Sequence, residues 1–198
     1  MMAGTMRADG RFWQRMLRLA GYYQGKIDGI CGPLQRAAEA AWAEAVERGL
    51  REYGEFDART EANIATLLPE AQRAARAWMR EAVAKAERLG VQVRIIGGTR
   101  TYAEQDELYA QGRTVAGKRV TNARGGYSWH NFGLAWDFGV FSGDGKRYIT
   151  DGEQYAALGA LARAVPGLEW GGDWKGFRDM PHVQLKRFAS VAEAREVF

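Results

Sequence analysis

Residues 128–138 read SWHNFGLAWDF, and this stretch decides the fold. Its second half alternates small and large apolar residues, which predicts a strand over 134–141. One face of this strand carries large apolar side chains, and the other face carries Ala135, Asp137 and Gly139. A carboxylate on such a face has a high desolvation cost unless a cation meets it, and a divalent metal ion would do so. The alternative for Asp137 is a buried ion pair with an arginine.

The chain contains only two histidines, and the first lies in this stretch. His130 precedes Asp137 by seven residues, an odd separation that a straight strand would place on opposite faces. The chain must therefore turn or bulge between the two side chains, and Gly133 has the conformational freedom to allow it. The alternative for a single histidine near aromatic residues is a core or surface position without a ligand role.

The second histidine lies in another dense stretch, EWGGDWKGFRDMPHVQL at residues 169–185. His182 leads a predicted strand over 182–185. His130, Asp137 and His182 would together supply the three protein ligands of a catalytic zinc site, which keeps a fourth position open for water. A thiolate-rich structural zinc site is excluded because the chain has one cysteine. Bound zinc would lower the pKa of that water to roughly 7 and polarise a carbonyl group.

Hydrolysis also requires a base, and the second stretch contains three carboxylates: Glu169, Asp173 and Asp179. We favour Asp179, because it stands three residues before the histidine and Pro181 prevents a continuing helix, so that a turn can bring the carboxylate to the metal. Arg100, at a predicted junction between strand and helix, is the candidate cation for balancing an oxyanion. The alternatives are a turn-forming role for Asp179 and a helix-flanking charge for Arg100.

The rest of the pattern predicts a helical front followed by a catalytic half of α+β character. A boundary near Leu68 divides the chain into units over 1–68 and 69–198. In the front, helices are predicted around 13–20, over 34–51 and over 57–68, with an ordered loop rich in turn-forming residues over 22–33. In the catalytic half, helices are predicted over 70–90, 101–111 and 155–165, and strands over 91–96, 134–141 and 182–185.

The composition of the chain narrows the kinds of partner that the protein can have. The chain has 198 residues, of which 46% are hydrophobic, so it can bury a substantial core. A net charge of +4 favours an anionic partner, although a charge this small is also typical of an ordinary soluble surface. The basic residues are interspersed with acidic ones, which argues against a nucleic-acid binder. No apolar run approaches ~18 residues, so no membrane span is expected, and Cys31 is predicted to be a buried thiol.

Three separated motifs resemble a known family. The first, Ser-x-His-x-x-Gly-x-Ala-x-Asp, starts at Ser128. The second, Glu-Trp-Gly-Gly-Asp-Trp followed by Asp-x-Pro-His, starts at Glu169 and ends at His182, and the third, Arg-Thr-Tyr-x-x-Gln, starts at Arg100. Through these motifs and their order, the region 70–185 is similar to the zinc D,D- and L,D-peptidases of peptidoglycan, particularly the L-alanyl-D-glutamate endopeptidases found among phage endolysins and bacterial wall hydrolases.

This resemblance implies one catalytic Zn²⁺ held by His130, Asp137 and His182. It implies that Asp179 is the catalytic base and that Arg100 contacts the substrate or the oxyanion. It also implies the fold of that family, a small antiparallel sheet backed by helices of the zinc D,D-peptidase/hedgehog-like type, and peptidoglycan as the partner.

The front of the chain, over about 10–68, resembles a three-helix peptidoglycan-binding module. The resemblance rests on Gly-Tyr-Tyr at 21–23, Ile-Asp-Gly at 27–29 and Gly-Pro at 32–33. The sequence departs from that pattern at Gln35, where a threonine is usual, and around Ala41 and Trp42, where the module ends in Phe-Gln. We therefore expect a three-helix module in front of the catalytic half.

The predicted reaction is hydrolysis of an amide bond in the peptidoglycan stem peptide, namely the bond between L-Ala and D-Glu. Alternatives of the same family are a D,D-carboxypeptidase and a D-Ala-D-Ala dipeptidase, and an alternative of another class is a non-catalytic wall-binding protein with structural zinc. Residues 1–10 contain no apolar core of an export signal. The protein is therefore expected to stay in the cytoplasm until a membrane-permeabilising partner releases it to the wall, as phage lysins do. We also expect it to act as a monomer.

Overall fold

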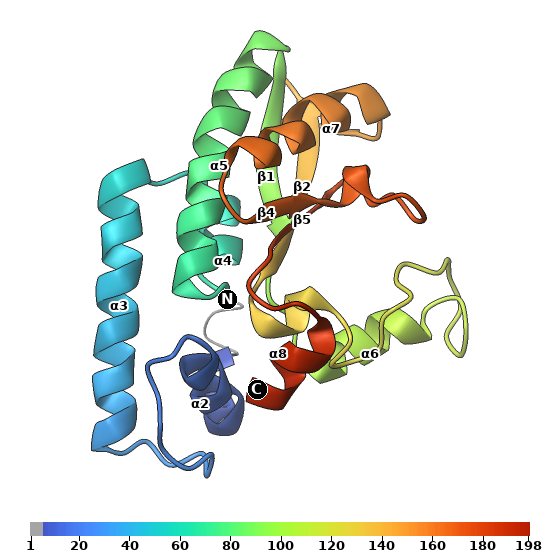
Figure 1. Ribbon diagram of the computed structural model, residues 1–198. Coiled ribbons are helices and arrows are strands. Elements are labelled where there is room, and N and C mark those ends of the chain that lie inside the picture. Colours follow the sequence, from blue (N-terminus) through green and yellow to red (C-terminus); the bar gives the residue numbers. More distant parts are fainter. Residues whose placement is uncertain (1–5) are drawn as a thin grey trace.

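The computed structural model describes residues 6–198 and contains one five-stranded antiparallel sheet with helices packed around it (Figure 1). The strands run in the order β1-β2-β5-β4, and the short β3 pairs with β2 beyond the end of β5. Their bounds are Val91–Gly97 for β1, Ala135–Ser142 for β2, Tyr148–Ile149 for β3, Leu168–Trp170 for β4 and His182–Leu185 for β5. The prediction of an α+β fold with a small antiparallel sheet backed by helices is confirmed.

The helices follow the predicted pattern with some shifts at their ends. Their bounds are Gly10–Leu19 for α2, Pro33–Tyr53 for α3, Ala58–Ile64 for α4, Pro69–Arg88 for α5, Tyr102–Ala110 for α6, Gly152–Gly159 for α7 and Val191–Val197 for α8. Short 3₁₀ helices cover Trp129–Phe132 (η1), Ala160–Ala164 (η2) and Gly171–Asp173 (η3). Helix α4 ends at Ile64 rather than at residue 68, because Thr66 and Leu67 bond three residues back and Pro69 already begins α5.

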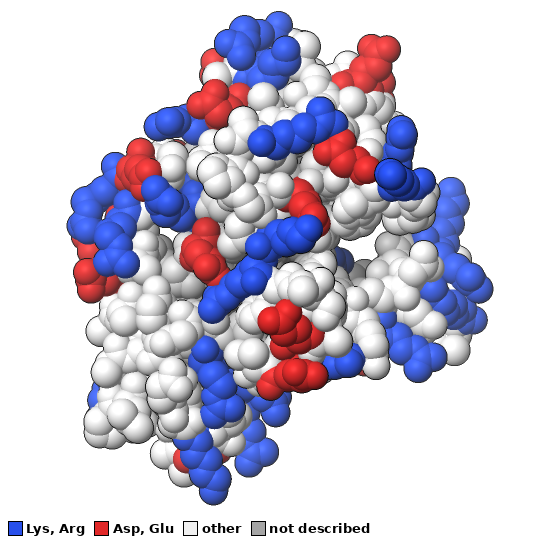
Figure 2. Space-filling model, viewed as in Figure 1, with Lys and Arg blue, Asp and Glu red and all other residues white. Residues whose placement is uncertain are grey.

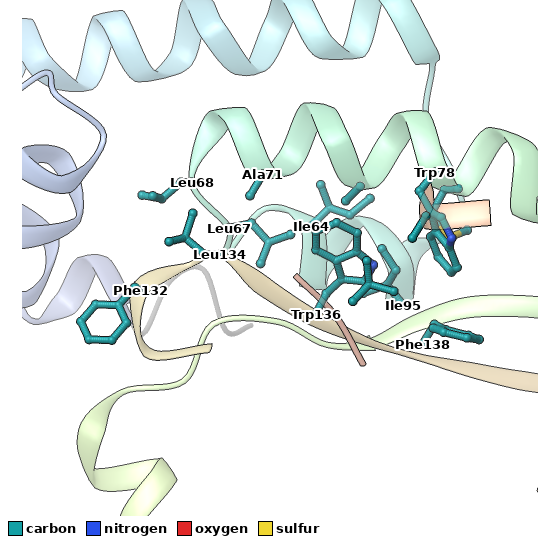
Figure 3. Close-up of a cluster of buried hydrophobic side chains, with 14 of the residues drawn as sticks. Ile64, Leu67, Leu68, Ala71, Trp78, Ile95, Phe132, Leu134, Trp136 and Phe138 are labelled. Atoms are coloured by element: carbon teal, nitrogen blue, oxygen red, sulfur yellow. The ribbon is translucent and has the colours of Figure 1, made fainter. Parts of the chain in front are cut away.

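One face of β2 is the centre of the hydrophobic core. Leu134, Trp136, Phe138 and Val140 are buried, as the alternating sequence predicts. Trp78 on α5 packs against Phe138 with ring centroids 4.9 Å apart, and its indole N–H donates to the Leu158 carbonyl at 3.2 Å. Figure 3 shows side chains of α4, α5, β1 and β2 in this cluster. The opposite face of β2 carries Asp137 between the small residues Ala135 and Gly139, with Phe141 toward the end of the strand.

Helix α4 covers the outer edge of the sheet. The backbone N–H of Ile95, on edge strand β1, donates to the Thr60 hydroxyl at 3.1 Å, and the Ile95 carbonyl accepts from the Asn63 amide at 3.1 Å. Just beyond β1, the Thr99 N–H donates to the Thr66 hydroxyl at 2.8 Å. These side chains provide hydrogen-bond partners for backbone groups that an edge strand would otherwise leave unpaired.

The front helices share the hydrophobic core of the sheet. Helix α3 packs along α5, as Figure 1 shows, and buried residues from α2 through α8 form one continuous cluster. The loop between α2 and α3 is ordered, as predicted, because the buried amide of Gln14 donates to Asp28 and accepts from the N–H groups of Asp28 and Gly29. The division of the chain into 1–68 and 69–198 stays a prediction.

The structure corrects the prediction of a buried thiol. Cys31 is exposed at the end of the loop before α3, and its neighbour Ile30 is 71% exposed. The loop is fixed by polar contacts to Gln14 rather than by burial of its own apolar residues, and this explains why the thiol faces solvent. Among residues 6–198, no helix has both the length and the apolar character needed to cross a membrane.

Gly133 makes the turn between His130 and Asp137, with φ at +65°, a left-handed conformation. A Cβ at this position would lie 2.8 Å from the end of the Met16 side chain and 3.0 Å from the Leu68 nitrogen. We therefore expect Gly133→Ala to lower the free energy of unfolding by at least about 1–2 kcal/mol, the cost of a left-handed conformation for a residue with a Cβ.

Denaturant unfolding monitored by tryptophan fluorescence measures this change. Gly152→Ala is the matched control, because Gly152 has no positive φ and its added Cβ would meet no atom within 4 Å. The control is expected to stay within about 0.5 kcal/mol of the unmodified protein. Equal stability of the two variants would contradict the role assigned to this turn.

Candidate metal centre

Three side chains from separate elements meet on the polar face of β2. His130 comes from η1, Asp137 from β2, and His182 from the first position of β5, where it is paired directly with Asp137 across the two strands. His130 Nε2 lies 3.2 Å from His182 Nδ1, and each of these nitrogens lies 3.4 Å from Asp137 Oδ1. The three predicted ligand residues therefore form a triangle of donor atoms small enough to hold one ion.

The outer hydrogen bonds of the two imidazoles determine which nitrogens face this triangle. His130 Nδ1 lies 2.8 Å from the Gly98 carbonyl, which can only accept, so its proton is on Nδ1 and a lone pair is on Nε2. His182 Nε2 lies 3.0 Å from the side-chain oxygen of Gln184, so a neutral His182 has its lone pair on Nδ1. Gln184 is itself oriented, because its NH₂ group donates to Glu169 at 2.9 Å.

Two lone pairs and one carboxylate oxygen thus point at each other across little more than 3 Å. Such an arrangement is repulsive unless a cation lies between the groups. Two imidazole nitrogens and a carboxylate oxygen, with the far ring nitrogens held by a carbonyl and an amide, are the donor set that divalent transition metals accept in proteins. The residues present therefore fit a metal ion.

The protonation states of the three side chains also fit a cation site. Burial opposes ionisation of Asp137, but the two neighbouring imidazoles hold the pKa of this carboxyl well below its usual range, so it is a carboxylate. Burial lowers the pKa of His130. Burial also disfavours protonation of His182, yet the contact with Asp137 raises its pKa. A proton on His182 can thus satisfy the carboxylate in the metal-free protein, and a metal ion would replace that proton.

Arg100 lies beside the triangle. Its guanidinium Nη2 is 3.6 Å from Asp137 Oδ2, the oxygen that faces away from the two histidines, and its backbone N–H donates to the His130 carbonyl at 3.0 Å. The arginine partner considered as an alternative for Asp137 is therefore present together with the two histidines. Asn131 fixes this arrangement, because its amide donates to the carbonyls of Arg100 and Thr101.

The three candidate carboxylates for the base occupy different surroundings. Asp173 is exposed and paired with Arg163, and Glu169 is bonded to Gln184 and Lys186. Asp179 is partly buried and lines the cleft that contains the two histidines. Burial raises the pKa of Asp179, with a smaller contribution from Asp137 in the same direction, which brings this carboxyl closer to the range useful for proton transfer.

The cleft over the triangle has a volume of about 790 Å³. The segment 120–130 forms one wall, and residues of the β4–β5 loop, including Trp174, Phe177 and Asp179, form another. Figure 1 shows both segments on the same side of the sheet. Of the tryptophans noted in the motifs, Trp129 and Trp174 line the cleft, and the Trp174 ring lies 5.2 Å from the His182 ring. The cleft is large enough for an extended peptide segment.

Two positioning residues were not predicted from the sequence. Gln184 stands two residues after His182 on β5, so strand alternation alone places both on one face, and this signal could have identified it. Asn131 lies inside the first motif, but its contacts to Arg100 and Thr101 join segments about thirty residues apart and depend on the folded chain.

Known proteins match the part of the chain that contains these residues. Residues 121–185, which contain all three members of the triangle, match the family model described as D-alanyl-D-alanine carboxypeptidase. The chain is 46% identical over 110 residues to the peptidoglycan L-alanyl-D-glutamate endopeptidase CwlK of Bacillus subtilis (strain 168). It is 42% identical over 62 residues to the L-alanyl-D-glutamate peptidase of Listeria phage A118. The resemblance deduced from the three motifs is confirmed.

The extent of these matches is limited. The match to the Bacillus subtilis protein covers 52% of this chain and 65% of that relative, and the match to the phage protein covers 29% and 21%. Among solved structures, the crystal structure of the Serratia marcescens L-Ala D-Glu endopeptidase ChiX is similar, with 27% identity, a TM-score of 0.48, and coverage of 66% of this chain and 88% of that chain.

The hydrogen-bonded series Glu169–Gln184–His182 leads to a test. Gln184→Met keeps a side chain of similar size but removes the acceptor for the His182 N–H, so His182 Nδ1 is no longer held toward the triangle. We expect the affinity for Zn²⁺, measured by competition with a chromophoric chelator, to fall about 10- to 100-fold. Lys186→Met is the control, because it removes only the exposed contact to Glu169. Equal affinities in the two variants would contradict this role for Gln184.

Proposed function

We propose that this protein is a zinc metallopeptidase that hydrolyses an amide bond in peptidoglycan stem peptides. The observation that carries the proposal is the convergence of two oriented imidazole lone pairs and one carboxylate at the floor of an open cleft. His130, Asp137 and His182 would hold the ion. Three protein ligands of this kind leave a coordination position for solvent, as catalytic zinc sites do.

Each remaining residue of the site has a role in the proposed reaction. A zinc ion held by these three residues would act as a Lewis acid, which would lower the pKa of a water molecule to roughly 7 and polarise the scissile carbonyl. Asp179 takes a proton from the attacking water and returns it to the amine that leaves. Arg100 stabilises the negative charge that develops on the carbonyl oxygen. The contact between Arg100 and Asp137 holds the guanidinium close to the reacting centre.

For the scissile bond we propose L-Ala–D-Glu. The supporting observation is that the relatives from Bacillus subtilis and Listeria phage A118 are both named for this bond. The matching family model is described as a D-alanyl-D-alanine carboxypeptidase, so D,D-carboxypeptidase activity is the second candidate. One chain supplies all five residues of the site, and we propose that the protein acts on the wall as a monomer, with the front helices serving as the wall-binding part.

Nucleic acid is not proposed as a partner. Figure 2 shows acidic and basic side chains interspersed over much of the visible face, with basic side chains predominating on the lobe that follows α6 and at the lower end near α2. A nucleic-acid site needs a continuous basic surface, because phosphate contacts dominate its affinity.

Digestion of purified cell walls tests the activity and the bond together. Mass spectrometry of the released fragments is expected to find new amino termini at D-Glu. Treatment with a chelator is expected to abolish this release and Zn²⁺ to restore it, because the proposed reaction depends on the ion. Release of free D-alanine without new D-Glu termini would instead favour the carboxypeptidase, and undiminished cleavage after complete metal removal would contradict the zinc mechanism.

Substitution of Asp179 separates catalysis from metal binding. Asp179→Asn preserves size and removes the base, so we expect kcat to fall about 10²- to 10⁴-fold with zinc content unchanged. Asp173→Asn is the matched control, since Asp173 pairs with Arg163 away from the triangle, and it is expected to keep near-normal turnover. If Asp179→Asn retained full activity, the base would have to be another group. If the unmodified protein bound cell walls without cleaving them, the result would support the alternative of a non-catalytic wall-binding protein.

A further inference from the structure

A tyrosine in the cleft lies on the same face of the sheet as the metal centre. Tyr148 on β3 is paired directly with Phe141 on β2, and directly paired residues of antiparallel strands point to the same face. Phe141, Gly139 and Asp137 alternate along β2, so Tyr148 shares their face. Tyr148 is 44% exposed and lines the cleft that contains both histidines.

Gly139 provides the space for this ring. A Cβ added to Gly139 would lie 2.9 Å from a ring carbon of Tyr148, so the ring lies directly over the glycine backbone. Gly139 is two residues from Asp137, about 7 Å along the strand. A glycine inside a strand often marks such a close approach, and here it lets an aromatic ring lie one side-chain position away from a proposed metal ligand.

The hydroxyl of Tyr148 is oriented by a hydrogen bond to a second tyrosine, which lies in the core. The backbone N–H of Val140 donates to Tyr155 Oη at 3.3 Å, and Tyr155 Oη lies 2.7 Å from Tyr148 Oη. Since the Val140 N–H can only donate, Tyr155 accepts from it and directs its own proton to Tyr148. Tyr155 is buried, with its ring 5.2 Å from Phe138, so it is held in place by the core.

Tyr148 therefore accepts a hydrogen bond from the core and keeps its own proton for a group in the cleft. If Tyr148 instead donated to Tyr155, the hydroxyl proton of the buried Tyr155 would have no acceptor, and an unpaired buried donor is costly. Burial, together with the hydrogen bond to Tyr148, raises the pKa of Tyr155, so this donor stays protonated. A hydroxyl donor with a fixed direction, on the same face of the sheet as the metal centre, is suited to bind an oxygen of a substrate.

We propose that Tyr148 donates a hydrogen bond to a carbonyl or carboxylate oxygen of the bound peptide, and that Tyr155 acts through Tyr148 as a positioning residue. The inference rests on the proposed function for the nature of the substrate. It adds a specificity contact that none of the three motifs contains. The bound oxygen belongs to a residue of the stem next to the scissile amide, because the Tyr148 ring lies over Gly139, one side-chain position from Asp137 on the same face of the sheet.

A double-mutant cycle tests the proposal. Tyr148→Phe, Tyr155→Phe and the double variant each remove only hydroxyl groups, and kcat and KM are measured on soluble disaccharide-peptide fragments of the wall. Tyr148→Phe is expected to lower kcat/KM about fivefold to tenfold, the effect of one neutral hydrogen bond. Tyr155→Phe is expected to lower it less, and to have no further effect when Tyr148 is already phenylalanine, because it acts only through that hydroxyl.

Controls separate this role from a structural one. Zinc content is expected to be unchanged in all three variants, and Tyr53→Phe on α3, far from the cleft, is expected to keep normal kinetics. Loss of the Val140 hydrogen bond is expected to lower the thermal stability of Tyr155→Phe. A purely structural role of Tyr155 would lower stability equally with and without the Tyr148 hydroxyl. It would not make the effect of Tyr155→Phe on kcat/KM depend on that hydroxyl. Unchanged kcat/KM in Tyr148→Phe, or additive effects in the double variant, would overturn the proposal.

A failure of the proposed function has a different signature. The unmodified protein would then release no new amino termini from the fragments. In that case the dissociation constant for the same fragments, measured through tryptophan fluorescence of the zinc-loaded protein, replaces kcat/KM in the cycle. Weaker binding by Tyr148→Phe would support the contact, whereas equal binding by both proteins, or no binding by either, would contradict it.

Discussion

Pairing of β2 with β5 is the constraint on which the site depends. It places Asp137 directly opposite His182, and the turn at Gly133 brings His130 to the same point. Hydrogen bonds on the far sides of the two imidazoles then direct their lone pairs inward, toward a carboxylate with a strongly lowered pKa. The core on the other face of β2 holds this geometry, because a register shift of one residue would move Asp137 to the apolar side.

Much of this arrangement could be predicted from local sequence. Alternation around Asp137 identified β2 and its buried face, the odd spacing from His130 required a turn, and the structure has that turn at Gly133. The long helices were also predicted, because their apolar spacing and glycine or proline boundaries are local signals. Asp179 could be preferred over Glu169 from its position before Pro181, and the structure places it in the cleft.

The features that were missed depend on contacts between distant segments. Strands β3 and β4 contain only two and three residues, too few for a periodic signal, and they are defined by their partners. The exposure of Cys31 follows from the polar contacts of Gln14, which lies in the preceding helix. Tyr148 carries no motif, and its position beside the metal centre becomes apparent only when β3 pairs with β2 beyond the end of β5.

The covering of β1 by α4 has a consequence for the behaviour of the protein at high concentration. An edge strand with free backbone groups is a template onto which a strand of another molecule can add, and this is a common route to aggregation. Here the hydroxyl of Thr60 and the amide of Asn63 occupy both backbone groups of Ile95, in the middle of that edge. Helix α4 thereby protects the β1 edge of the sheet, at Ile95, against strand addition by another copy.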